Sequence, residues 1–345
     1  MATSISAVPV TSVTAPVPVT VVTGFLGAGK TTLLNRLLPK PEMAGTAVLV
    51  NEFGEIAIDH LLVEKLDDTT MLLPSGCLCC SVLGDMARAL RDLAPRVQAG
   101  EVKRVVMETT GLADPAPVVQ TLMSDVMLAR MFRMDGMVTV VDAVHGLGAL
   151  DAHEEAVRQV AMADRIVLSK TDLAAGTDAL RARIAALNPG APVLVADRGN
   201  IDPASILECG LFDASGKIAD VQAWLNDVAW GKGGAHANGV GGRIHSFCLT
   251  FDEPLHWSGI GMCLEMLIGT RGENLLRVKG ILNLVGQERP VAIHGVQHMF
   301  HEPELLPAWP PGDPRTSRIV FITKDLSRET VEEGLRAFER AAAGE

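Results

Sequence analysis

The segment GFLGAGKT, from Gly24 to Thr31, constrains the fold of this chain more than any other feature. It follows a short β-branched run, Val17 to Val22, and leads into a helical pattern, Thr31 to Leu38. In the pattern G-x-x-x-x-G-K-[ST], glycine-rich backbone turns its N–H groups around phosphate oxygens, and the helix N-terminus adds the positive end of its dipole. A strand, this loop and a helix in succession predict an α/β fold that binds a nucleotide.

Individual residues of this loop have separate expected roles. Lys30 reaches the β- and γ-phosphates, and the Thr31 hydroxyl binds Mg²⁺. A carboxylate at the end of another core strand completes the Mg²⁺ shell, and Glu108, three residues before Gly111, is preferred over Asp142 for this role. Lys30 and Glu108 are the predicted catalytic residues. The residues of this loop predicted to bind the nucleotide are Gly24, Gly27, Ala28, Gly29, Lys30, Thr31 and Thr32.

Short apolar runs alternate with helical patterns through the first two thirds of the chain. The strand-like runs are Val17 to Val22, Thr46 to Asn51, Val102 to Glu108, Met134 to Val141, Arg165 to Ser169 and Ala191 to Ala196. The helical patterns are Thr31 to Leu38, Ser81 to Leu93, Asp151 to Ala163 and Thr177 to Leu187. Apolar strands separated by helices predict a P-loop NTPase fold of the α/β class, with a mostly parallel sheet covered on both faces.

The alternation ends after Trp230, where the composition changes. The Gly-rich segment 231–242 has no apolar periodicity and predicts a linker. Beyond it we expect strands over Arg243 to Phe251, Leu275 to Val285, Val291 to Phe300 and Arg318 to Thr323, a helix over His256 to Ile268, and a closing helix with Val331, Leu335, Phe338 and Ala342 on one face. The predicted organisation is a disordered lead-in over 1–18, a P-loop domain over 19–230, the linker, and a smaller α+β domain over 243–345.

Charge and hydropathy exclude several classes of partner. Lys and Arg number 30 against 41 Asp and Glu, so the formal net charge is −11, and no polybasic run is present. We therefore expect no nucleic-acid partner. We expect no membrane partner either, because no apolar stretch is long enough to span a bilayer. The N-terminus has neither the basic nor the long apolar region of a secretory signal, which favours a cytoplasmic location with reduced thiols.

The segment SKTD, Ser169 to Asp172, indicates that the nucleotide carries guanine. An aspartate at this position accepts two hydrogen bonds, from the ring N–H and the exocyclic amino group of guanine, and adenine does not offer this pair. Lys170 packs its stem along the base, while Ser169 stands where an asparagine is common. Lys170 and Asp172 are therefore the predicted base-binding residues, and GTP is the predicted nucleotide.

Three thiols, those of Cys77, Cys79 and Cys80, lie just before a predicted helix. A helix N-terminus favours thiolate, and soft thiolates prefer Zn²⁺ or Cu(I) to Mg²⁺. A closed structural zinc site takes four protein ligands, so this cluster predicts a transition-metal site with an open or borrowed fourth position. A redox thiol pair and simple buried cysteines remain alternatives. The three histidines of HGVQHMFH, at positions 294, 298 and 301, are interpreted as structural.

These motifs together resemble those of the CobW-type metallochaperone GTPases, within the CobW/HypB/UreG superfamily. The matching segments are GFLGAGKTT at 24–32, NEFGE at 51–55, GCLCC at 76–80, ETTGLADP at 108–115, VVDA at 140–143, SKTDL at 169–173, KGILNL at 279–284, GVQHMFHEP at 295–303 and RIVFI at 318–322. The resemblance implies a CobW-type C-terminal domain and GTP hydrolysis coupled to delivery of a metal, most often zinc, to a client apo-metalloprotein. By matching position, Cys77, Cys79 and Cys80 would bind the zinc. Many members carry a histidine-rich stretch between the domains, where this chain has only His236.

The predicted function is that of a zinc chaperone GTPase with GTP, Mg²⁺ and Zn²⁺ as its ligands. The segment Asn51 to Asp59 is the expected switch that senses the γ-phosphate, and Glu52 is a candidate additional metal ligand. Other functions stay open. A P-loop kinase or ATPase with structural cysteines predicts a preference for ATP, and a nucleotide-dependent metal sensor predicts binding without turnover. A cobalt or iron chaperone for cofactor or metalloenzyme maturation predicts a different metal.

Overall fold

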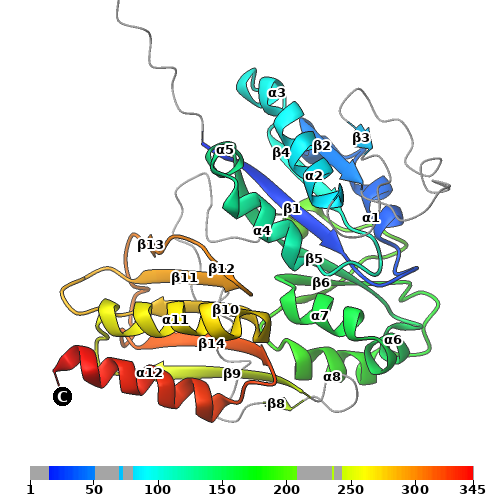
Figure 1. The fold of residues 1–345 in the computed structure, drawn as a ribbon. Coiled ribbons are helices and arrows are strands. Elements are labelled where there is room, and N and C mark those ends of the chain that lie inside the picture. The colour runs from blue at the N-terminus through cyan, green and yellow to red at the C-terminus, as the bar shows by residue number, and fades with distance from the viewer. Residues whose placement is uncertain (1–14, 51–69, 73–80, 208–234, 237–242, 345) are drawn as a thin grey trace, which may run out of the picture.

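A parallel sheet forms the centre of the N-terminal domain (Figure 1). The computed structural model describes residues 15–50, 70–72, 81–207, 235–236 and 243–344. Within these residues the sheet has seven strands, all paired in parallel, in the order β3-β2-β4-β1-β5-β6-β7. They are β1 (Val17–Thr23), β2 (Thr46–Val50), β3 (Thr70–Leu72), β4 (Arg104–Glu108), β5 (Phe132–Asp142), β6 (Arg165–Ser169) and β7 (Val193–Val195). The predicted parallel α/β sheet is confirmed, and its carboxyl edge collects the loops that carry the motifs.

Helices cover both faces of this sheet, as predicted. On one face, α1 (Lys30–Leu37) packs Leu33, Leu34 and Leu37 against β-branched side chains of the strands, and α9 (Pro203–Ile206) adds Ile206. The helices on the other face are α2 (Ser81–Asp92), α3 (Ala94–Gln98), α4 (Ala116–Ser124), α5 (Val126–Met131), α6 (Gly146–Ala152), α7 (Glu154–Met162) and α8 (Asp178–Leu187). No helix in the described ranges is long and apolar enough to cross a membrane.

The helix predicted over Asp151 to Ala163 is confirmed from Glu154 onward as α7, but Asp151 and Ala152 end α6. Between the two helices, His153 adopts an extended conformation, with φ −126° and ψ 121°. The His153 imidazole stacks on the Phe25 ring, with 4.5 Å between the ring centroids. This tertiary contact fixes the break, and the apolar pattern of the sequence does not reveal it.

A second, antiparallel sheet forms the C-terminal domain. In the described part of the chain its strand order is β12-β11-β10-β14-β9-β8, with β13 paired to β11. The strands are β8 (Ala235–His236), β9 (Ile244–Phe251), β10 (Leu275–Leu282), β11 (Val291–Val296), β12 (Met299–Phe300), β13 (Glu304–Leu305) and β14 (Ser317–Lys324). The expected strand over Val291 to Phe300 is therefore a tight hairpin, which turns at Gln297 with φ 50°.

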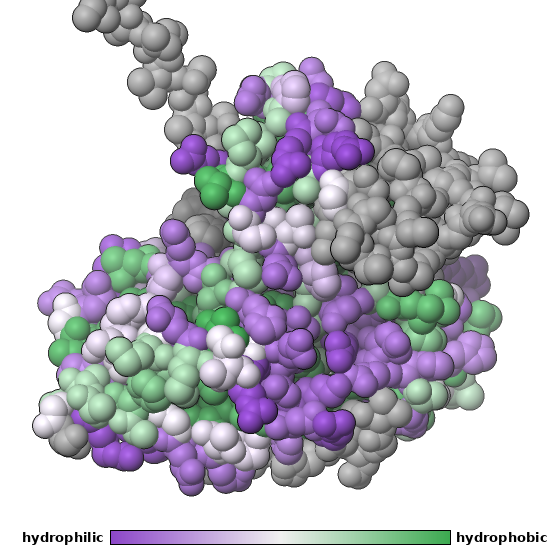
Figure 2. Space-filling model, viewed as in Figure 1, coloured by the Kyte–Doolittle hydropathy of each residue, from purple (hydrophilic) through white to green (hydrophobic). Residues whose placement is uncertain are grey.

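Two helices, α11 (Trp257–Arg271) and α12 (Arg328–Ala343), cover the face of this sheet that points away from the N-terminal domain (Figure 1). The outer side of α11 leaves Trp257, Met262 and Met266 exposed. Figure 2 shows apolar colouring over this helix.

One buried apolar cluster spans the two domains. The opposite face of the C-terminal sheet packs on α7 and α8, so Val160 of α7, Ile281 of β10 and Ile322 of β14 belong to the same buried cluster. A buried ion pair crosses the same boundary, between Asp164 after α7 and Arg277 of β10. Each domain therefore completes the hydrophobic burial of the other.

Candidate nucleotide-binding site

The loop between β1 and α1 has the shape of a phosphate cradle. Gly24 has φ 145°, and a Cβ at this position would lie 2.3 Å from the carbonyl oxygen of Val140 on β5. Gly29 caps α1 in a left-handed conformation with φ 93°, which a side chain would strain. Between them, the N–H of Ala28 donates to the carbonyl of Phe25 over 3.1 Å. Glycine is thus required at both ends of this turn, as the motif predicts.

Lys30 lies inside this loop. Its side-chain ammonium donates a 2.9 Å hydrogen bond to the carbonyl of Gly24, and the residue is only 8% exposed. The positive charge is therefore held at the first turn of α1, next to the helix N-terminus. Both features attract an anion such as a phosphate group.

Thr31 and Glu108 meet at the end of β4. The Thr31 hydroxyl donates a 2.8 Å hydrogen bond to Oε1 of Glu108, whose residue is 5% exposed. The hydroxyl and the carboxylate lie side by side next to the phosphate loop. Both are hard oxygen ligands, the kind that Mg²⁺ prefers. The donors present therefore fit a magnesium ion.

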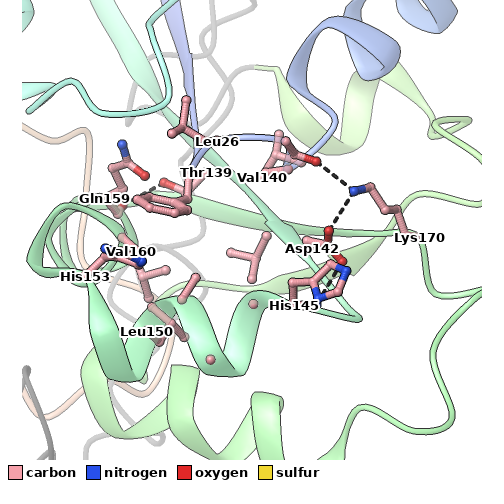
Figure 3. Close-up of a pocket in the computed structure, with 18 residues that line it drawn as sticks. Leu26, Thr139, Val140, Asp142, His145, Leu150, His153, Gln159, Val160 and Lys170 are labelled. Atoms are coloured by element: carbon pink, nitrogen blue, oxygen red, sulfur yellow. Dashed lines mark hydrogen bonds and ion pairs between the residues drawn. The ribbon is translucent and has the colours of Figure 1, made fainter.

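Asp142, the alternative acid, has other contacts. Its Oδ2 accepts a 2.6 Å hydrogen bond from Lys170, and its Oδ1 accepts 2.7 Å and 3.1 Å bonds from the backbone N–H groups of Val144 and His145. Burial raises the pKa of Asp142, but these hydrogen bonds outweigh it and the net pKa is lowered. Asp142 therefore orders the turn after β5 and holds Lys170 (Figure 3).

The predicted base-binding residues line a cavity of about 310 Å³ beside the loop. Gly29, Thr32, Lys170 and Asp172 all contribute to its wall. Arg198, in the loop after β7, also lines it, and its Nε lies 3.8 Å from Oδ2 of Asp172. Sequence reasoning missed Arg198, since a single arginine before a glycine carries no motif.

A second cavity, of about 360 Å³, lies behind the phosphate loop (Figure 3). Phe25 and Leu26 of the loop form one wall, and His153 and Gln159 contribute another part. The side-chain amide of Gln159, on α7, donates to the carbonyls of Gly111 and Ala113, over 3.1 Å and 3.0 Å. Gln159 is a further residue that the sequence motifs did not reveal.

The predicted metal site lies outside the described residues, as do Asn51 to Asp59 with Glu52, and Cys77, Cys79 and Cys80. Within the ranges that the structure describes, no three His, Cys, Asp or Glu side chains are grouped so that they could hold a metal ion.

The histidines of HGVQHMFH have structural surroundings. The rings of His294 and His301 stack at 4.7 Å, and burial lowers the pKa of both imidazoles. The Nδ1 of His298 lies 3.2 Å from the carbonyl oxygen of Ile268.

Burial raises the pKa of the Cys263 thiol on α11 to about 11, which disfavours the thiolate that a metal needs.

Comparison with known proteins agrees with this geometry. The family model of the CobW/HypB/UreG nucleotide-binding domain matches residues 18–195, and that of the cobalamin synthesis protein CobW C-terminal domain matches residues 244–339. Zinc chaperone YjiA from Escherichia coli (strain K12) is 33% identical over 318 residues, which cover 92% of this chain and 96% of that protein. Zinc-regulated GTPase metalloprotein activator 1 from Saccharomyces cerevisiae is 29% identical, and the match covers 93% of this chain and 83% of that protein.

The overall architecture has a solved counterpart. The crystal structure of Zn(II)-bound YjiA GTPase from E. coli superposes with a TM-score of 0.68 and 29% sequence identity. The superposition covers 94% of this chain and 99% of the other. With both domains matched in sequence, the chain belongs to the CobW/HypB/UreG family.

Proposed function

We propose that this protein is a GTP-hydrolysing zinc chaperone, which binds Zn²⁺ at Cys77, Cys79 and Cys80 and transfers it to a client apo-metalloprotein. One observation carries the nucleotide part. The phosphate loop, the Thr31–Glu108 pair and the cavity with Asp172 converge on the carboxyl edge of one sheet. The relatives, a zinc chaperone and a zinc-regulated GTPase metalloprotein activator, support the metal part.

The nucleotide would lie along this edge. Lys30 would supply a positive charge to the β- and γ-phosphates, and Thr31 with Glu108 would hold Mg²⁺. When bound, Mg²⁺ neutralises phosphate charge as the terminal phosphoryl group leaves. Asp172 would accept the two guanine N–H groups at the other end of the site, and Lys170 would line the base.

The thiol segment and the switch segment leave the sheet beside this site. Val50, the last residue of β2, pairs in register with both Glu108 of β4 and Leu72 of β3. Asn51 to Asp59 follows Val50 directly, and the segment that leads to Cys77 follows Leu72. The two strands that precede these segments therefore end level with Glu108, which supports a metal site whose ligands respond to the γ-phosphate.

The thiols also have a favourable position in the chain. Cys80 immediately precedes α2, a helix of 12 residues, whose N-terminus favours thiolate. Thiolates persist in a reducing compartment, so we place the protein in the cytoplasm.

The test is a zinc titration against a competing chelator, with GDP and then with a non-hydrolysable GTP analogue. About one Zn²⁺ should bind per chain, and the two nucleotides should give affinities that differ by about 5- to 150-fold, the ordinary range of coupling between sites. Acid should release the metal, because protons compete for the thiolates.

Two variants make the result specific. Cys79→Ala should abolish the high-affinity zinc site, while Cys248→Ala, a partly buried thiol on β9, should leave it intact. Equal zinc affinity in both nucleotide states would contradict a nucleotide-driven chaperone. The same titration with nickel, cobalt and iron identifies the preferred metal.

A further inference from the structure

Ion pairs join helix α7 to the C-terminal sheet at both ends of the helix. At its start, Glu154 forms an ion pair with Lys324 of β14. Directly after its end, Asp164 pairs with Arg277 and, over 3.0 Å, with Lys279, both on β10. Between these ends, α7 packs directly on β10. The C-terminal domain therefore helps to fix the position of α7.

The middle of α7 holds the loop that follows β4. The Arg158 guanidinium donates a 2.9 Å hydrogen bond to Oδ2 of Asp114 and a 2.8 Å bond to Glu154. The neighbouring Gln159, 1% exposed, donates its side-chain amide to the carbonyls of Gly111 and Ala113. Hydrogen bonds from Lys324 and Arg158 lower the pKa of Glu154, so this carboxylate stays charged and links the two cations.

The same loop touches the phosphate cradle. Gly111 lies so close to Leu26 that a Cβ on Gly111 would be 2.7 Å from the Leu26 backbone. Gly111 is also three residues after Glu108, the proposed ligand of Mg²⁺. A displacement of this loop would therefore change the surroundings of the terminal phosphate.

We propose that Gln159 and Arg158 are positioning residues for GTP hydrolysis, and that α7 transmits the position of the C-terminal sheet to the loop 111–114. The proposal rests on the GTP hydrolysis proposed above. It makes the C-terminal domain a regulator of turnover, because a partner that shifts this sheet also shifts α7. Where the partner changes the affinity for GTP relative to GDP, linkage requires the reverse effect, so the bound nucleotide then alters the affinity of the C-terminal domain for that partner.

Two variants of the full chain test the two halves of this connection. Gln159→Leu keeps the side-chain volume and removes both hydrogen bonds to the loop. We expect kcat for GTP hydrolysis to fall about five- to tenfold, with a smaller change in KM. Lys324→Met, on β14 of the C-terminal sheet, removes the charge that anchors Glu154. It should lower kcat about two- to fivefold and reduce the preference for a GTP analogue over GDP.

The matched control is Arg336→Met on α12. Arg336 pairs with Glu332 one turn away in the same helix and lies over the Phe251 ring, so its loss removes an ion pair that does not involve α7. This variant should keep the wild-type kcat and nucleotide preference.

The outcomes separate the proposals. Absence of GTP turnover in the wild-type protein would overturn the proposed function itself. Normal wild-type turnover with an unchanged kcat and GTP-over-GDP preference in Lys324→Met would overturn the transmission through α7, even if the melting temperature falls. If Gln159→Leu does not fold, Lys324→Met alone decides. A loss of kcat in Lys324→Met and not in Arg336→Met supports the proposal.

Discussion

Ser169 links the base side of the nucleotide site to the phosphate side. Its hydroxyl donates a 2.6 Å hydrogen bond to the carbonyl of Ala28 in the phosphate loop, and the residue is buried. Lys170 reinforces the link with a 2.7 Å bond to the carbonyl of Gly27. The serine that stands where an asparagine is common therefore makes a hydrogen bond between the two loops.

The substitution Asp172→Asn should change the base that the protein prefers. The new side-chain amide would offer an N–H where guanine presents its own N–H, so affinity for GTP should fall at least about 100-fold, as expected for the loss of two hydrogen bonds to a charged group. Xanthosine triphosphate has a carbonyl in place of the amino group, so it should bind the variant more tightly than it binds the wild type. Competition binding measures both effects. Asp178→Asn, at the start of α8, is the control. Equal affinity of the wild-type protein for ATP and GTP would refute guanine selection.

Replacing Lys30 with Ala should abolish turnover and weaken GTP binding more than about tenfold, because a point charge beside the phosphates is lost. GDP should be affected less, since it lacks the γ-phosphate. Phosphate release and fluorescence titration provide the measurements. Lys103→Ala, an exposed lysine before β4, serves as the control. A Lys30→Ala protein that still turns over GTP would show that this loop is not the nucleotide site.

Strand positions follow from the sequence wherever polar residues bound an apolar run. β6 matches its expected range, Arg165 to Ser169, because Asp164 and Lys170 delimit it. In contrast, α4 and α5 were not predicted. Pro115 and Pro117 lie at the start of α4, where proline is accommodated in the first turn of a helix, and α5 begins with a side-chain cap from Asp125. Local signals of this kind are weak in short helices.

The candidate site was predictable to the extent that it depends on motifs and strand ends. Thr31 and Glu108 meet because the carboxyl ends of neighbouring parallel strands lie at one edge. Arg198 and Gln159 could not be predicted, since tertiary packing alone brings them to the site. The same holds for the break at His153, which depends on a ring stacked from the phosphate loop.

The close approach of β1 and β5 gives a prediction for Gly24→Ala. A Cβ 2.3 Å from the Val140 carbonyl forces the two strands apart, so the variant should lose nucleotide binding and more than about 2 kcal/mol of unfolding free energy. Gly100→Ala is the matched control, because Gly100 also has a positive φ, 75°, but no atom close to an added Cβ. It should cost only about 1 kcal/mol and leave nucleotide binding intact. Equal losses in the two variants would contradict the steric explanation.

At the scale of the whole molecule, a cavity of about 380 Å³ lies between the domains. β5 contributes Asp135 to its wall, and the segment around β12 and β13 contributes His301 and Glu304. Burial raises the pKa of Glu304 to about 7, and the positive charge of Arg133 opposes this rise. A carboxyl group at the domain boundary therefore changes its charge near neutral pH.

Glu304 should make the protein less stable as pH rises from about 4.5 to 7. Over this range the Glu304 carboxyl keeps its proton in the folded protein and loses it in the unfolded chain. The folded state is therefore favoured fully below the pKa of Glu304 in the unfolded chain, and this advantage is lost above its pKa in the folded protein. Glu304→Gln should be more stable than the wild type by about 1 kcal/mol at pH 8, a value reduced for partial exposure, and nearly equal to it at pH 4.5. Denaturant titrations at both pH values provide the measurement. A constant difference between the two proteins would refute the raised pKa.

The shared apolar core also determines how the molecule comes apart. Val160 lies in the N-terminal domain and Ile281 and Ile322 in the C-terminal one, yet they occupy a single buried cluster. Separating the domains would therefore expose the side chains of this cluster to water. Heating should melt both in one calorimetric transition, and neither half, expressed alone, should remain folded.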